Sequence, residues 1–170
     1  MILFVQNTIT RIIDWKVKNG LTILRVSLAI VFFWFGFLKF FPGISTAEEI
    51  ASKTVLWLTR GHLQSNWSMP LLGIWECLIG IGLLFRKWLT ITLLLLYFQM
   101  MGTLLPLIVF RNETWTDHLF VPTLLGQYII KNAVLIAAGL VLGATINGGG
   151  LSSHPFIKTF FKSNKKIRSN

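Results

Sequence analysis

The chain has 170 residues, of which 54% are hydrophobic and 13% are charged, and its mean hydropathy is +0.67. This composition excludes a soluble globular domain and is typical of a membrane protein. The formal net charge is +10, but most basic residues lie between or beyond the apolar runs, so we do not expect a nucleic-acid partner. The one cysteine, Cys77, excludes a disulfide relay within the chain, because such a relay needs a pair.

Four long apolar runs account for the high hydropathy, at residues 21–41, 69–85, 88–110 and 121–142. A helix needs about 20 apolar residues to cross the hydrocarbon core of a bilayer. Backbone polar groups must be satisfied internally in lipid, which favours helices. The sequence therefore predicts an all-α integral membrane four-helix bundle over residues 21–144, in contact with membrane lipids.

The basic residues predict the orientation of this bundle. One side of the membrane would carry Arg11, Lys16, Lys18, Arg86, Lys87, Lys158, Lys162, Lys165, Lys166 and Arg168. The other side would carry Lys53, Arg60 and Arg111, offset by several carboxylates. By the positive-inside rule, both termini are cytoplasmic, in a bacterial-type inner membrane. Residues 145–170 are then a basic cytoplasmic tail beside the membrane.

Residues 1–20 form the first segment in chain order. Their apolar residues recur at helical spacing, at Ile2, Val5, Ile9, Ile12 and Ile13. This pattern predicts an amphipathic helix on the cytoplasmic interface with Trp15 as an anchor, and Asn19-Gly20 would break it before the first crossing. A frayed cytoplasmic extension is the alternative.

The first crossing carries a charge near each end. Arg25, Ala29, Phe32, Gly36 and Lys39 recur at spacings of four and three residues, which places them on one helix face. Ionisable side chains are costly in lipid, so this face is expected to turn toward protein or a water-filled cavity.

A short outer helix over residues 47–60 is predicted next. Ser45 with Glu48, or Thr46 with Glu49, matches a capping box at its start. Gly61 is the expected residue in the left-handed conformation just after its end.

The second crossing is expected to be capped by Ser68, with Pro70 in its first turn. It places Gly73, Glu76 and Gly80 on one face, and small residues at this spacing predict a close helix contact around Glu76.

The third and fourth crossings each carry a polar stripe. Thr92, Gln99, Thr103 and Pro106 share a face of the third, and Pro106 is expected to kink it. The fourth, opened by Pro122, aligns Gln127, Lys131, Leu135 and Ala138. The glycines at 148–150 would close the membrane domain.

Four buried charges are expected inside the bundle: Arg25, Lys39, Glu76 and Lys131. Helical depth makes a Glu76–Lys131 pair reasonable, with Gln99 nearby and Lys39 as the competing partner for Glu76. An unmatched buried cation suits an anionic or hydrogen-bonding ligand, such as a quinone carbonyl or a phenolate. Alternatively, these side chains only fix the register of the helices.

Other cofactor sites have little support in the sequence. His62 and His118 fall in outer loops and His154 in the tail, so no crossing offers a histidine to a buried haem. Two isolated histidines without a spacing motif do not predict a metal site, and no phosphate-binding loop or nucleophile elbow is present. A quinone is therefore the candidate cofactor, with no haem, metal or disulfide relay expected.

Several stretches together resemble the DoxX family of membrane proteins. They are LRVSLAIVFFWFGFLKFFPG (24–43), WECLIGIGLL (75–84), QMMGTLLPL (99–107) and GQYIIKNAVLIAAGLVLGA (126–144). The first is also similar to the YkgB-like branch, which is linked to reactive-chlorine resistance. The resemblance implies a four-helix membrane bundle and an association with redox, as in small subunits of thiosulfate–quinone oxidoreductase. The matched positions are Lys39, Glu76, Gln127, Lys131 and Asn132.

Three functions remain open at this stage. The first is an accessory subunit of a quinone-linked oxidoreductase or oxidative-stress process, which binds a quinone-like or anionic molecule near Lys39, Glu76, Gln99, Gln127, Lys131 and Asn132. The second is a non-redox transporter or binder of an amphiphile or anion. The third is a structural subunit that only scaffolds another membrane protein in a complex. An oxidoreductase partner subunit would accompany the first function, and a homo-oligomer is a further partner to consider. No catalytic residue is predicted.

Overall fold

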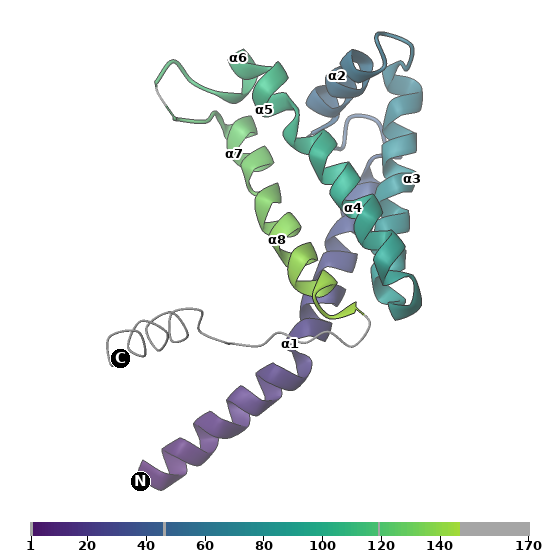
Figure 1. Ribbon diagram of the computed structural model, residues 1–170. Coiled ribbons are helices and arrows are strands. Elements are labelled where there is room, and N and C mark those ends of the chain that lie inside the picture. Colours follow the sequence, from purple (N-terminus) through teal and green to yellow (C-terminus); the bar gives the residue numbers. More distant parts are fainter. Residues whose placement is uncertain (1, 46, 119, 147–170) are drawn as a thin grey trace, which may run out of the picture.

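The computed structural model describes residues 2–45, 47–118 and 120–146, with the backbone alone for residues 2–7. Figure 1 shows the described chain as helices joined by short connections. They are α1 (Ile2–Leu38), α2 (Glu48–Leu58), α3 (Ser65–Leu84), the 3-10 helix η1 (Arg86–Trp88), α4 (Leu89–Leu104), α5 (Pro106–Val109), α6 (Arg111–Thr114), α7 (Leu124–Ile130) and α8 (Asn132–Gly143).

Four helical stretches are long and apolar enough to cross a membrane: Thr8–Leu38, Ser65–Leu84, Arg86–Val109 and Leu124–Gly143. The predicted all-α bundle with four candidate crossings is therefore confirmed. Its two ends are called here the α2 end, which also holds α5 and α6, and the η1 end (Figure 1). The glycines at 148–150 and the rest of the tail from residue 147 lie outside the described residues.

The most extensive helix contact joins α1 to α3, and glycine makes it possible. A Cβ atom at Gly36 would lie 2.8 Å from the backbone nitrogen of Cys77, and one at Gly80 would lie 2.7 Å from that of Phe33. Backbones can approach this closely only where no side chain intervenes. The predicted inward face of the first crossing is confirmed, because Ala29 and Phe32 are almost fully buried.

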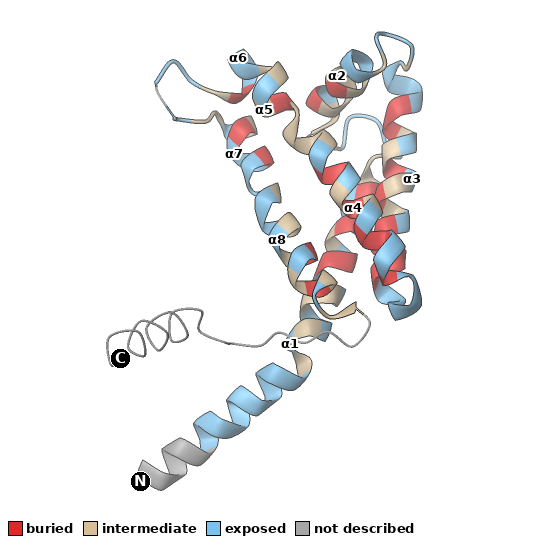
Figure 2. Ribbon diagram, viewed as in Figure 1, coloured by how far each residue is buried: buried red, intermediate tan, exposed pale blue. Residues whose placement is uncertain are grey.

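The hydrophobic core lies where α1, α3, α4 and α8 meet, toward the η1 end. Its buried members are Leu28, Ala29, Phe32, Ile79, Leu83, Leu89, Leu93, Leu96, Met100 and Leu142. Figure 2 shows this burial in red on α1, α3 and α4, whereas α7 and α8 are pale blue or tan over most of their length. The fourth crossing is thus packed on one side and open on the other.

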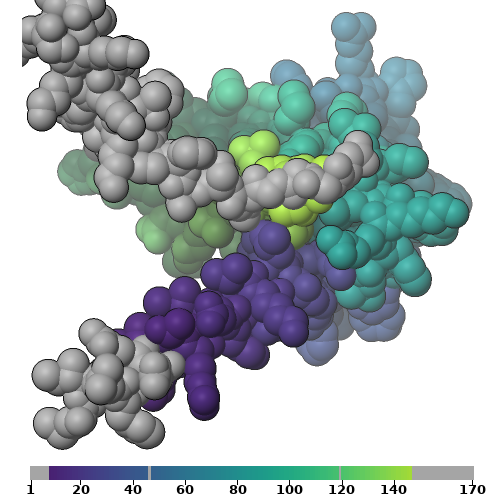
Figure 3. Space-filling model, turned by 60° about the horizontal axis from the view of Figure 1, so that its bottom comes forward, coloured from purple at the N-terminus to yellow at the C-terminus, as the bar shows by residue number. Residues whose placement is uncertain are grey.

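Helix α1 is continuous through Asn19-Gly20, so the predicted break there is wrong. The Asn19 side chain donates a hydrogen bond to the Trp15 carbonyl, 2.9 Å away, and this local bond accompanies the helix rather than ending it. The N-terminal half of α1 stands clear of the bundle (Figures 1 and 3). The exposed side chains include Ile9, Ile12 and Trp15, and their placement on a membrane interface stays a prediction.

The predicted outer helix is confirmed as α2, but both of its expected ends differ in detail. The Glu48 carboxylate accepts a hydrogen bond from the Gly43 N–H at 2.7 Å instead of completing a capping box with Ser45; Thr46 lies outside the described residues. At the other end, Arg60 takes the left-handed position with φ +51°, and Gly61 follows with φ +87°. Their N–H groups bond to Trp57 and Leu56, which makes a Schellman motif.

The sequence also predicted features of the second, third and fourth crossings at proline residues, and the structure confirms some of them and contradicts others. The kink at Pro106 is confirmed, since α4 ends at Leu104 and Pro106 begins α5. The predicted start of the second crossing is wrong, because α3 begins at Ser65, and Pro70 lies inside it. Thr123, rather than Pro122, caps α7: its hydroxyl accepts a hydrogen bond from the Gly126 N–H.

Candidate functional site

A buried cluster of Lys39, Glu76 and Gln99 lies between α1, α3 and α4 in the half of the bundle nearer the α2 end. Lys39 directly follows α1, Glu76 lies in the middle of α3, and Gln99 lies in α4. The Gly36–Gly73 contact brings α1 onto α3, which sets Lys39 beside Glu76. The packing of the three helices thus brings two charged side chains and one amide side chain together at a single point.

The cluster is tightly bonded. The Lys39 Nζ lies 2.5 Å from Glu76 Oε2, and the Gln99 Nε2 donates to Glu76 Oε1 at 2.9 Å. The side chains of Lys39 and Glu76 are each 9% exposed. Both carboxylate oxygens therefore have a donor, as a carboxylate removed from water requires.

Lys39 is also suited to its position at the end of α1. Its Nζ reaches the carbonyl of Phe35 at 3.5 Å, and a cation at a helix C-terminus interacts favourably with the helix dipole. The ion pair is neutral as a unit, so burial costs it less than it would cost either charge alone.

Tyr128 on α7 lies within electrostatic range of the Glu76 carboxylate. The residue is 41% exposed, and no hydrogen bond joins its phenol to the cluster among the described residues. The sequence analysis did not single it out, because there it reads as one aromatic among many.

The predicted Glu76–Lys131 pair is wrong, and Lys39 is the partner of Glu76. The predicted burial of Lys131 is also wrong, since Lys131 and Gln127 are exposed and Asn132 is half-buried. The physical reason is distance between helices: glycines bring α1 against α3, whereas α7 has no comparable contact with α3. Arg25 is half-buried and lies about 20 Å along α1 from Lys39, and its buried Nε has no hydrogen-bond partner among the residues that the structure describes.

The aromatic and thiol groups beside the cluster serve packing. The Trp75 indole donates to the Leu95 carbonyl at 3.2 Å and stacks on Phe98, with ring centroids 5.6 Å apart. The Cys77 thiol lies 3.8 Å from the Phe33 carbonyl. These contacts join neighbouring helices and do not involve the Lys39–Glu76 ion pair.

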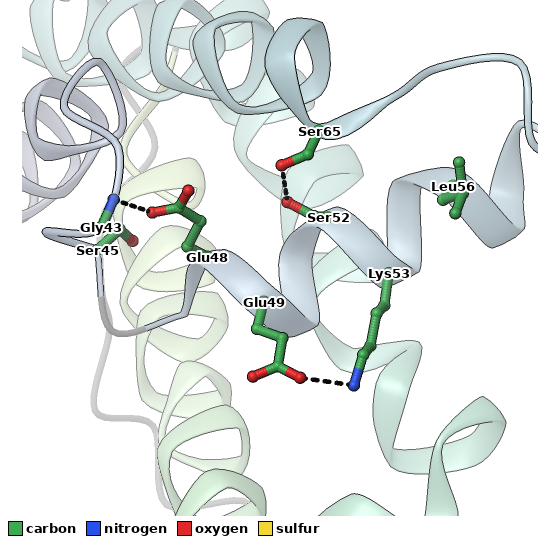
Figure 4. Close-up of a pocket in the computed structure, with 8 residues that line it drawn as sticks. All are labelled: Gly43, Ser45, Glu48, Glu49, Ser52, Lys53, Leu56 and Ser65. Atoms are coloured by element: carbon green, nitrogen blue, oxygen red, sulfur yellow. Dashed lines mark hydrogen bonds and ion pairs between the residues drawn. The ribbon is translucent and has the colours of Figure 1, made fainter.

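A second polar region lies at the α2 end, where its lining reaches the first residue of the second candidate crossing. It is an open pocket of about 560 Å³, lined by Gly43, Ser45, Glu48, Glu49, Ser52, Lys53, Leu56 and Ser65. Figure 4 shows its internal bonds: Glu48 to Gly43, Ser52 to Ser65, and Glu49 to Lys53. Lys53 also pairs with Glu113 of α6 at 3.1 Å, so this region ties α2 to α3 and α6.

Two residues that line the pocket have shifted pKa values, and the shifts follow from these ion pairs. Hydrogen bonding and attraction to Lys53 lower the pKa of Glu49, and hydrogen bonds to Glu49 and Glu113 raise the pKa of Lys53. Both groups are solvent-exposed, so these shifts describe local attraction rather than a catalytic environment.

Within the described residues, no group of three histidine, cysteine or carboxylate side chains could hold a metal ion. No family model, curated protein or solved structure matches this chain.

Proposed function

We propose that this protein is a DoxX-like accessory subunit of a membrane redox or oxidative-stress process, which binds a quinone-like small molecule beside the Lys39–Glu76–Gln99 cluster. The observation that carries the proposal is the cluster itself, with a neutral buried ion pair and an amide between three apolar helices. In this proposal both termini face the cytoplasm of a bacterial-type inner membrane, as the charge distribution predicts.

The cluster has hydrogen-bonding capacity left for a ligand. The Lys39 ammonium has three N–H donors and uses two, on Glu76 and on the Phe35 carbonyl. Gln99 has a second N–H that is free to donate. A quinone carbonyl accepts such bonds, and the hydroxyl of the reduced form can donate to Glu76. An apolar ring is also compatible with the surrounding helices.

A non-redox binder or transporter of an anion or amphiphile is the second candidate. It is favoured by Arg25 and Lys131, which lie well inside the candidate crossings and have no ion pair with a carboxylate among the described residues. Gradient-driven uptake into vesicles that is indifferent to added quinone would support it over the first proposal.

Extraction into nanodiscs, followed by absorption spectroscopy and mass spectrometry of bound small molecules, tests the proposal. We expect one quinone-like molecule per chain, retained by the exposed-site variant Thr90→Ser and lost in Glu76→Gln and Lys39→Met. Bulk lipid alone, in a preparation that binds no added ubiquinone or menaquinone, would refute the quinone assignment.

A further inference from the structure

The exposed side of α7 and the start of α8 carries an unusual stripe for a membrane-crossing segment. It consists of Leu124, Gln127, Lys131 and Val134, which we call the α7 stripe. Their spacing of three, four and three residues places them on one side of the helix. All four are exposed, Leu124 by 87% and Val134 by 69%. The stripe thus lines up an amide and a cation between two apolar residues.

The two polar side chains of the stripe have no partner among the described residues. The amide of Gln127 and the ammonium of Lys131 make no hydrogen bond or ion pair there, whereas Lys39 and Gln99 are both bonded to Glu76. Lys131 lies about 10 Å along the helix from Leu124, the first residue of the crossing. An unpaired cation at such a depth is costly when it faces lipid.

The backbone at Lys131 supports the same conclusion. Helical structure is interrupted there, between α7 and α8, and the ψ angle of −22° belongs to a tighter 3-10 turn. The Val134 N–H bonds to the Lys131 carbonyl three residues earlier, at 3.0 Å. Irregular backbone within a bilayer is tolerated where protein covers it or water reaches it.

A second copy of this chain lacks a carboxylate for Lys131. The sequence has six acidic residues, and two of them, Asp14 and Glu76, lie within the candidate crossings. Glu76 already pairs with Lys39 and Gln99 inside the bundle. Asp14 belongs to the N-terminal half of α1, and that half projects from the end of the bundle opposite to α7 (Figure 1).

We propose that the α7 stripe is an intramembrane docking surface for a transmembrane helix of a different protein, which brings a carboxylate to Lys131. Gln127, one turn away, supplies an amide hydrogen bond, and Leu124 and Val134 pack on either side. A single polar residue in an apolar seam specifies register in helix pairs. This interface does not require a bound quinone, so it stands or falls separately from the proposed function.

A synthetic transmembrane helix with one central glutamate, in a leucine–alanine background, is the probe for this surface. A helix with glutamine in its place is the matched control. Energy transfer from the labelled chain in vesicles measures association. We expect the glutamate probe to associate roughly threefold to twentyfold more tightly than the glutamine probe. Lys131→Met should abolish this preference, and Lys131→Glu should transfer it to a lysine-bearing probe.

Three results would overturn the proposal. One is equal association of the glutamate and glutamine probes, both in vesicles with anionic lipid and in vesicles without it. This result would mean that Lys131 interacts with lipid headgroups and does not select a carboxylate on a helix. Another is a preference that survives in Lys131→Met with Ile130→Lys, where the cation is moved about 100° around the helix. The third is self-association of labelled copies that Lys131→Met reduces. Lys131→Gln provides a second neutral variant, and the thermal unfolding of each variant establishes its folding.

Discussion

At the scale of single residues, Glu76 determines how the polar interior is organised. Its two oxygens meet Lys39 and Gln99, and each of these contacts crosses between helices. Removal of one partner from a buried pair leaves the other without compensation, which costs more than removal of both. The contribution of the pair to stability can therefore be measured separately from the ligand binding that we propose for it.

The Lys39–Glu76 pair is expected to show strong coupling in a double-mutant cycle. Glu76→Leu or Lys39→Met alone should lower the free energy of unfolding by about 3–5 kcal/mol, and the double variant should recover most of this loss. Reversible unfolding in mixed micelles measures it. Additive losses would show that the two side chains act independently.

Arg60 occupies a conformation that favours glycine, with φ +51° at the end of α2. Arg60→Gly should raise the free energy of unfolding by less than about 1 kcal/mol, because relief of left-handed strain exceeds the added chain entropy. Thr59→Gly is the matched control, since Thr59 has φ −91°, and it should be neutral or destabilising. The opposite order of the two variants would contradict the Schellman motif.

At the scale of elements, α1 and α3 form the rigid pair to which the other helices are added. Their contact is made by glycines whose neighbours are backbone atoms that cannot move aside. By contrast, α8 is the part of the fourth crossing that packs on the core, mainly near the η1 end, and α7 contributes no residue to it (Figure 2). This difference explains why the buried cluster forms on α1, α3 and α4.

A methyl group at Gly80 should separate α1 from α3. The added Cβ would lie 2.7 Å from the Phe33 nitrogen and 2.9 Å from the Ala29 carbonyl oxygen, so Gly80→Ala should destabilise the protein by about 1–3 kcal/mol. Gly102→Ala is the control, because nothing lies within 4 Å of a Cβ there. Thermal unfolding in detergent compares the two, and equal effects would argue against the tight helix contact.

At the scale of the whole molecule, α1 is longer than the stretch that a membrane crossing needs. Helix α1 has 37 residues, about 55 Å, against a hydrocarbon core of about 30 Å. Its projecting half must therefore extend beyond the bilayer or bend along its surface. At the opposite end, Lys53 ties α2 to α6 and so holds the connections between crossings together.

The attachment of α2 is expected to depend on pH through Glu49 and Lys53. Folding lowers the pKa of Glu49 from 4.5, so its contribution is present above pH 4.5 and is lost as the pH falls through the lowered value. Folding raises the pKa of Lys53 from 10.5, so its contribution is present below pH 10.5 and is lost as the pH rises through the raised value.

Hydrogen exchange of the α2 backbone measures this attachment. Protection should be flat between about pH 5 and 10 after correction for intrinsic exchange, and it should fall outside that window. Lys53→Met should remove the dependence and lower protection within the window. An unchanged profile in Lys53→Met would show that the pairs do not hold α2.

The sequence by itself determined the helical class, the four crossings, α2 and the kink at Pro106. These follow from run length, hydropathy and the missing N–H of proline, which are local properties. The sequence also placed Lys39, Glu76 and Gln99 among the candidates. Only the tertiary structure decided that Lys39, rather than Lys131, pairs with Glu76, because depth along a helix does not give the distance between helices. That distance depends on the glycine contacts of α1 and α3, which leave α7 outside and Lys131 exposed.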